Sequence, residues 1–160
     1  MPNPAVYGAA AIVALLHDIT IVVGIFAILG KVIDLEVNAM FVTALLAIIG
    51  YSVNDTIVVF DRIRENLLNN PGAQMKQMVN AAITQSLSRS LNTSLTLILA
   101  LVALMLIGGV TIRPFILVLL VGTIAGTYSS IAVASQIVVL WEERILRRLT
   151  SRKRQGRYGY

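Results

Sequence analysis

Cysteine is absent from this 160-residue chain, and charged residues make up only 13% of it. Without cysteine the chain has no disulfide, no thiol nucleophile and no thiolate metal site. A soluble domain carries about 25% charged residues, and a chain of this length cannot bury 57% hydrophobic residues in a soluble core. The low charge and a mean hydropathy of +0.81 therefore predict a membrane protein in contact with the lipid bilayer.

Catalytic motifs are equally scarce. The sequence has one histidine, His17, and no serine in a Gly-x-Ser-x-Gly setting. Two acids within apolar runs, Asp18 and Asp55, lack the Tyr-Asp and Gly-x-Gly-Asp contexts of intramembrane aspartyl proteases. We therefore expect no enzyme, no cofactor and no metal site.

Four apolar runs are long enough to cross a membrane as helices, at residues 5–29, 38–60, 86–107 and 114–141. About 20 helical residues span roughly 30 Å of hydrocarbon, and the runs lack the short alternation of a membrane β-barrel. The sequence predicts an all-α, polytopic membrane helix bundle with four transmembrane helices. The transmembrane domain covers residues 1–150, with an amphipathic cytoplasmic loop at 61–85, and a basic tail follows at 151–160.

Glycine and proline mark the expected ends of these runs. Gly30 closes the first run, ahead of a polar link with Asp34 and Glu36, and Gly108 stops the third. Pro114 suits the first turn of the fourth helix. The Asn-Asn-Pro-Gly sequence at residues 69–72 predicts a turn flanked by short amphipathic helices.

The distribution of Lys and Arg predicts the orientation of the chain. With four spans, both termini and the middle loop lie on one side, which collects ten basic residues against two on the other, Lys31 and Arg113. Basic residues concentrate on the cytoplasmic side, so both termini are expected in the cytoplasm. The basic tail is expected to contact the anionic lipid bilayer rather than nucleic acid.

Six polar side chains fall inside the predicted spans: His17, Asp18, Asn54, Asp55, Arg89 and Asn92. A charged residue at mid-span costs at least about 2.5–3.5 kcal/mol, so such groups face protein or water. Asp55 lies roughly 9 Å from the helix end expected at Asp61, at 1.5 Å per residue. Arg89 lies near the start of the next, antiparallel helix, so we expect the acid and the base at similar depth.

Hydroxyls and amides extend this pair into an expected proton path. One helical stripe on the third span joins Arg89 to three neutral polar residues, Asn92, Thr93 and Thr96. On the second span, Tyr51 and Ser52 share the face of Asp55, next to Asn54. In this interpretation Asp55 binds and releases a proton while Arg89 holds the ionised form. A static ion pair that fixes helix register is the alternative.

The other polar and small residues allow two interpretations each. His17 and Asp18 point about 100° apart on a helix, so they are not expected to line one path together, and either an accessory role or a packing hydrogen bond fits them. On the last span small residues recur every four positions, a pattern of close helix contact for which a hinge is the alternative. They are Gly122, Gly126, Ser130 and Ala134.

Residues 48–66, Ile-Ile-Gly-Tyr-Ser-Val-Asn-Asp-Thr-Ile-Val-Val-Phe-Asp-Arg-Ile-Arg-Glu-Asn, closely resemble the signature of the SecF family. SecF is the second membrane half of the SecDF protein-export factor, within the RND transporter superfamily. Leu-Leu-His-Asp at 15–18 and Ser-Leu-Ser-Arg-Ser-Leu-Asn-Thr-Ser at 86–94 support the resemblance, which is less tight around Ser88 and Leu91.

The resemblance implies a subunit of the SecDF complex, which uses the proton-motive force to assist protein translocation in the bacterial inner membrane. It implies SecD, the SecYEG translocon and the translocating preprotein as partners. In that family the Asp of the Asn-Asp-Thr motif and the Arg of the Ser-Arg-Ser motif belong to the proton path. These residues correspond to Asp55 and Arg89 here.

A complete SecF has six spans and an extracytoplasmic domain between the first two, through which the preprotein is handled. The present chain resembles only the last four spans, so we expect an RND-like half bundle that lacks the first two. Two alternative functions are a structural module that holds SecD and the channel without proton transport, and the proton-path half of an RND small-molecule pump.

Overall fold

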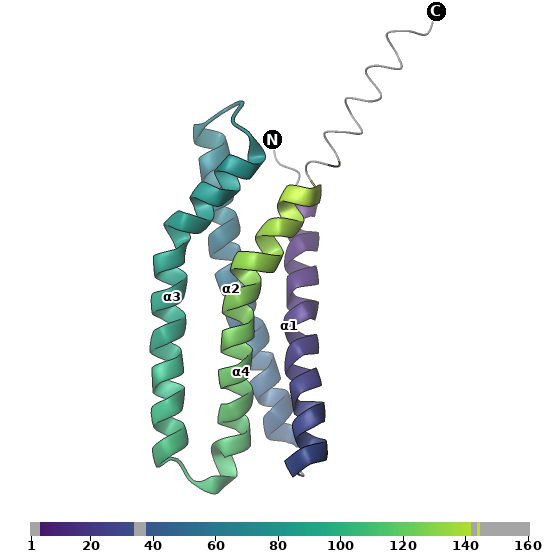
Figure 1. Ribbon diagram of the computed structural model, residues 1–160, viewed down its shortest axis with the longest axis vertical. Helices are drawn as coiled ribbons and strands as arrows, with labels where there is room; N and C mark the ends of the chain where they lie inside the picture. Colours follow the sequence, from purple (N-terminus) through teal and green to yellow (C-terminus); the bar gives the residue numbers. More distant parts are fainter. Residues whose placement is uncertain (1–3, 34–37, 142–143, 145–160) are drawn as a thin grey trace, which may run out of the picture.

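Four long helices form the computed structural model, which describes residues 4–33, 38–141 and 144 (Figure 1). Helix α1 spans Pro4–Ile33, α2 spans Ala39–Asn69 and α3 spans Met75–Ile107. A short 3-10 turn, η1 at Val110–Ile112, leads into α4 at Arg113–Ser129. A π-helical segment, η2 at Ser130–Ala134, continues α4 into a last helical stretch that is described as far as Trp141.

Each of the four helical segments is long and apolar enough to cross a membrane. This confirms the predicted all-α, polytopic membrane helix bundle. The start of α1, the turn between α2 and α3 and the end of the fourth segment lie at one end of the bundle, as Figure 1 shows. Helices α2 and α4 each contact all three other helices, so these two helices form the centre of the bundle.

Local chemistry explains several helix ends. The side chain of Asn38 accepts hydrogen bonds from the backbone N–H groups of Met40 (3.0 Å) and Phe41 (3.2 Å), which caps α2. Pro114 lies in the first turn of α4, as predicted. The predicted turn at residues 69–72 is present, and Gly72 adopts a φ of 94°, a conformation that glycine reaches without steric cost.

Two predicted ends are wrong. Gly30 does not close α1, which continues to Ile33, because a helix is the conformation that satisfies backbone groups where lipid offers no partner. The segment 61–85 is also largely helical: α2 continues to Asn69 and α3 begins at Met75. The expected short amphipathic helices are therefore extensions of the spans. Asp34, Glu36 and the tail at 151–160 lie outside the described residues.

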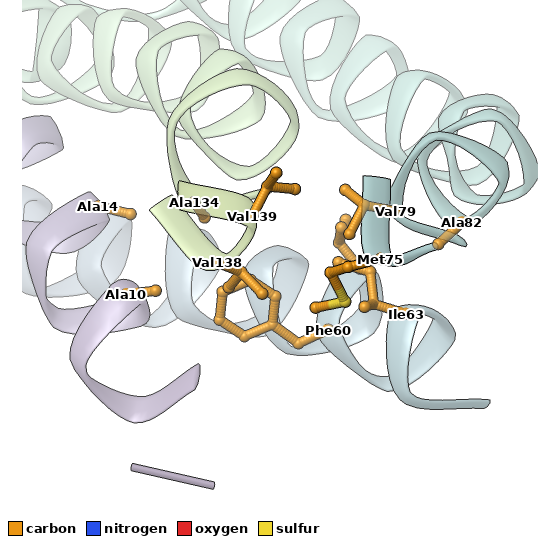
Figure 2. Packing of buried hydrophobic residues seen from close by; sticks show 11 residues of the cluster. Ala10, Ala14, Phe60, Ile63, Met75, Val79, Ala82, Ala134, Val138 and Val139 are labelled. Atoms are coloured by element: carbon orange, nitrogen blue, oxygen red, sulfur yellow. The ribbon is translucent and has the colours of Figure 1, made fainter. Parts of the chain in front are cut away.

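Two apolar clusters fill the bundle interior at different heights. The first lies near the α2–α3 turn, and Figure 2 shows side chains from all four helical segments meeting in it, among them Ala10, Phe60, Val79 and Val138. The second lies toward the opposite end and joins α1, α2 and α4. Its buried members are Val22, Phe26, Ala44, Ile48 and Val118.

Candidate polar site within the membrane bundle

A buried polar layer separates the two apolar clusters. On α1 it consists of Asp18, between Ala14 of the first cluster and Val22 of the second. The other helices add buried hydroxyl groups at the corresponding height. These are Ser52 and Thr56 on α2, Ser86, Ser90 and Ser94 on α3, and Thr123, Thr127, Ser129 and Ser130 on the fourth segment. Polar groups cannot be left unsatisfied in a membrane interior, so their partners define the site.

Asp55 lies in this layer, half-buried, and two serines from different helices hold its carboxylate. Ser90 of α3 donates a hydrogen bond of 2.6 Å to Asp55 Oδ1. Ser130, the first residue of η2, donates to Asp55 Oδ2. Both serine side chains are buried. The carboxylate of α2 thus ties α3 and the π-helical segment together.

Asp18 forms a second buried acid site in the same layer. Its side chain is 1% exposed, and Ser52 of α2 donates a hydrogen bond of 2.5 Å to its Oδ2. His17 Nδ1 lies 3.2 Å from Asp18 Oδ1. His17 and Asp18 therefore contact each other, although the expected angle between neighbouring helix positions argued against a shared role. Ser52, expected to serve Asp55, contacts Asp18 instead.

The small residues of α4 bring its backbone against α2 beside both acids. Gly122 and Gly126 are buried, and a Cβ atom built on Gly122 overlaps three side-chain atoms of Ile48. A Cβ atom built on Gly126 would lie 3.2 Å from Ser52 Cβ. One turn further along, Ser130 reaches Asp55, and Ala134 belongs to the first apolar cluster. Absence of side chains at 122 and 126 is what lets α4 approach the polar layer.

Arg89 does not contact Asp55 as the sequence suggested. Among the described residues neither Asp55 nor Asp18 forms an ion pair with Lys or Arg. The Arg89 side chain is exposed and lines a cavity of about 350 Å³ between α2 and α3, together with Asp61, Arg62 and Glu65. Arg62 is held there by Glu65 at 2.6 Å and by Gln85 at 2.8 Å.

The neutral part of the predicted proton path lies on the outer side of α3. Asn92, Thr93 and Thr96 are exposed and line a groove with Tyr51 of α2. The Thr93 and Thr96 hydroxyls donate to backbone carbonyls of their own helix, at 2.9 and 2.8 Å. Asn54 is exposed as well. None of these residues is among the buried groups that bond to Asp55, which come from Ser90 and Ser130.

Ser90 is the site residue that sequence reasoning missed. The row Ser86, Ser90 and Ser94 repeats every four residues and is buried along its whole length, a spacing that places three hydroxyls on one helix face. The serine spacing is visible in the sequence, but the proton path was predicted on the neighbouring stripe because that stripe carries the charged residue Arg89. Ser130 was expected only to pack helices, and it also binds Asp55.

Hydroxyl partners allow each acid to exist with or without a proton. A serine hydroxyl rotates between donating to a carboxylate and accepting from a carboxylic acid, whereas Lys and Arg can only donate. Each carboxyl group can therefore be protonated or ionised and still keep a hydrogen-bond partner. Among the described residues, no group of three or more His, Asp or Glu side chains is placed to hold a metal ion.

The fold and the site together define a multi-pass helical membrane protein with one buried and one half-buried acid in a serine-rich layer. The chain belongs to the family of protein export membrane proteins SecD/SecF, C-terminal part, whose family model matches residues 4–144. This confirms the resemblance to SecF that the motif at residues 48–66 indicated.

Individual relatives agree with the family assignment. The chain is 55% identical over 150 residues to protein translocase subunit SecF of Thermobaculum terrenum, covering 94% of this chain and 47% of that protein. It is 46% identical to protein translocase subunit SecDF of Thermus thermophilus, over 86% of this chain and 18% of that protein. A crystal structure of SecDF in a super-membrane-facing form matches with a TM-score of 0.86 and 44% identity, over 92% of this chain and 20% of that one. The chain spans about half the length of the SecF relatives that it matches.

Proposed function

We propose that this chain is the proton-conducting half bundle of a SecF-type subunit, which as part of SecDF uses the proton-motive force to assist protein export with the SecYEG translocon. The observation that carries the proposal is Asp55, an acid inside a membrane bundle held by two hydroxyls and no cation among the described residues. Intramembrane acids of this kind mark ion and proton pathways.

Asp55 is the proton acceptor in this mechanism, and Ser90 and Ser130 hold it in both protonation states. Arg89 precedes Ser90 and lines the cavity between α2 and α3, so a turn of its long side chain brings a permanent cation toward the ionised carboxylate. Water along the groove lined by Tyr51 and Thr93 connects the site to one side. Asn54, Asn92 and Thr96 extend this hydrated face.

A static ion pair between Asp55 and Arg89 was the competing explanation. No such contact is present among the described residues, which favours the proton path over an ion pair that fixes the register of α2 and α3. The names of the relatives, which are protein translocase subunits, favour protein export over a small-molecule pump.

Exposed polar residues within the spans support a neighbouring helical partner. Arg89, Asn54 and Asn92 are exposed on membrane helices, and lipid cannot solvate them. We assign the covering surface to SecD, in keeping with the SecDF relatives. The preprotein is contacted through the extracytoplasmic domain that the resemblance implies. The excess of Lys and Arg at one end supports cytoplasmic termini in the bacterial inner membrane.

Substitution of Asp55 tests the proposal in the complete SecDF complex reconstituted with the translocon. Asp55→Asn keeps the shape of the side chain but cannot exchange a proton, so proton-dependent export should fall to background while membrane insertion stays normal. Arg89→Lys keeps the charge but loses the planar guanidinium fork, so export should fall as well. Thr43→Val is the control and should export normally, because it removes a hydroxyl near the start of α2 that bonds only to the backbone carbonyl of Ala39 in the same helix. Full export by Asp55→Asn would favour the structural module instead.

A further inference from the structure

We propose that Asp18 is a second proton-binding site on the same path, linked to Asp55 through Ser52, with His17 as its outer end. This inference rests on the function proposed for Asp55 and extends that path from the α2–α3 side of the bundle to α1.

Burial and partners distinguish Asp18 from an ordinary packing residue. It is more buried than Asp55, and among the described residues its carboxylate contacts the Ser52 hydroxyl and the His17 ring nitrogen but no Lys or Arg. Burying an acid in a membrane bundle is costly, and an apolar residue of similar size would avoid the cost. A hydroxyl partner accommodates both the charged and the neutral acid, as at Asp55.

Ser52 connects the two acids because of its position on α2. It precedes Asp55 by three residues, about 4.5 Å along the helix axis, so both side chains lie on the same face. Gly126 of α4 faces Ser52, and a Cβ atom there would lie 3.5 Å from Ser52 Oγ. Ser130, one turn beyond Gly126, contacts Asp55. The backbone of α4 at Gly126 therefore packs directly against Ser52, beside the hydroxyl that donates to Asp18.

His17 provides a connection to the surface of the bundle. Its side chain is 36% exposed, whereas that of Asp18 is 1% exposed. An imidazole can take a proton on one ring nitrogen and release one from the other. The titratable groups around Asp18 are therefore His17 on α1 and Asp55, one turn from Ser52 on α2. Among the described residues no Lys or Arg pairs with Asp18.

The proposed transfer moves one proton and no electrons. The O–H bond of protonated Asp55 breaks, and its proton passes to a bridging water that spans one helical turn. The water gives a proton to Ser52, and Ser52 gives its hydroxyl proton to Asp18 Oδ2, where a new O–H bond forms. Asp18 then releases a proton to His17, which returns Asp18 to its ionised form.

Proton flux into vesicles containing the complete SecDF protein tests this path, with a trapped pH-sensitive dye and an imposed membrane potential. Asp18→Asn should lower the flux about a hundredfold or more, the scale of a positioned proton acceptor. Ser52→Ala should lower it about tenfold, because the link between the acids is lost. Ser94→Ala is the matched control: Ser94 is equally buried, but its hydroxyl bonds only to its own helix, so its flux should match the unmodified protein.

Infrared spectroscopy separates proton binding from a structural role. Lowering the pH should produce a carbonyl band of a buried carboxylic acid that shifts in D2O, is missing in Asp18→Asn and is present in Asp55→Asn, because Asp18 then takes its proton from solution through His17. Loss of flux in Asp55→Asn with normal flux in Asp18→Asn would overturn the second site and leave the proposed function standing. Normal flux in Asp55→Asn would overturn both. Where Asp18→Asn fails to assemble, equal flux in Ser52→Ala and Ser94→Ala overturns the link.

Discussion

Serine hydroxyls hold both acids of the polar layer, Asp18 through Ser52 and Asp55 through Ser90 and Ser130. Each serine comes from a different helix than its acid, so the same bonds that position the proposed proton sites also hold the helices together. A single lost hydroxyl is therefore expected to affect stability as well as transport. This coupling separates the interhelical serines from those that bond within their own helix, such as Ser94.

Ser130→Ala should lower the free energy of unfolding by about 1–3 kcal/mol, the cost of a buried acceptor left without its partner. Ser94→Ala makes the same chemical change at a buried position without touching an acid, so its effect should be smaller. Thermal unfolding of the purified protein in detergent compares the two variants. Equal stability would mean that the Ser130–Asp55 bond does not hold η2 against α2.

The sequence identified Asp55 but not its partners, for a geometric reason. Helix periodicity tells which residues share a face, whereas it does not tell which face turns inward. Arg89 and Ser90 point about 100° apart, so a modest rotation of α3 decides which of them meets Asp55. The structure turns Ser90 inward and leaves Arg89 exposed. Burying the serine face costs less than burying a guanidinium. The sequence does not show how many faces of α3 are covered by other helices, so it could not decide which face is buried.

Helix α4 combines two features beside the polar layer, a glycine contact with α2 and a π-helical segment that starts at Ser130. Figure 1 shows the ribbon of the fourth segment changing direction in its upper part, where η2 follows α4. A π segment inserts an extra residue into the helix and frequently occurs at functional sites. Spacing of small residues every four positions indicated the close contact, whereas no local signal in the sequence indicated the π segment.

Three Gly→Ala variants test the contact between α4 and α2. Gly122→Ala should destabilise the protein by about 1–3 kcal/mol, because the added methyl overlaps the Ile48 side chain. Gly126→Ala should have a smaller effect, since Ser52 needs to yield only slightly. Gly50→Ala on α2 is the matched control: nothing lies within 4 Å of its added Cβ, and alanine favours a helix by about 1 kcal/mol.

Unfolding temperatures of these variants in detergent should rank Gly122→Ala lowest and Gly50→Ala at or above the unmodified protein. If Gly122→Ala and Gly50→Ala unfold at the same temperature, the α2–α4 contact is looser than the structure has it. Proton flux is a second measurement. The methyl group added in Gly126→Ala lies next to Ser52, so this variant should lose proton flux even where its unfolding temperature is nearly unchanged.

The number and type of membrane helices followed directly from the sequence, while the last residues of α1 and α2 and the first residue of α3 did not. Runs of apolar residues identify the part of each helix in lipid, and α2 and α3 extend well beyond those runs, to Asn69 and from Met75. Arg62 and Asn66 of α2 both donate hydrogen bonds to Gln85 of α3 across the extensions. Such polar contacts between neighbouring helices outside the apolar run leave no hydropathy signal.

The even number of spans makes the orientation of the whole chain testable with two positions. Gln74 is exposed in the α2–α3 connection, at the end that carries Arg62, Arg64 and Lys76, and Gly109 is exposed in the α3–α4 connection at the other end. Because this chain has no cysteine, Gln74→Cys and Gly109→Cys each introduce one new thiol into the complete protein. A membrane-impermeant maleimide added to spheroplasts should label Gly109→Cys directly and Gln74→Cys only after the membrane is opened. The reverse pattern would place the basic end outside, against the preference of Lys and Arg for the cytoplasmic side.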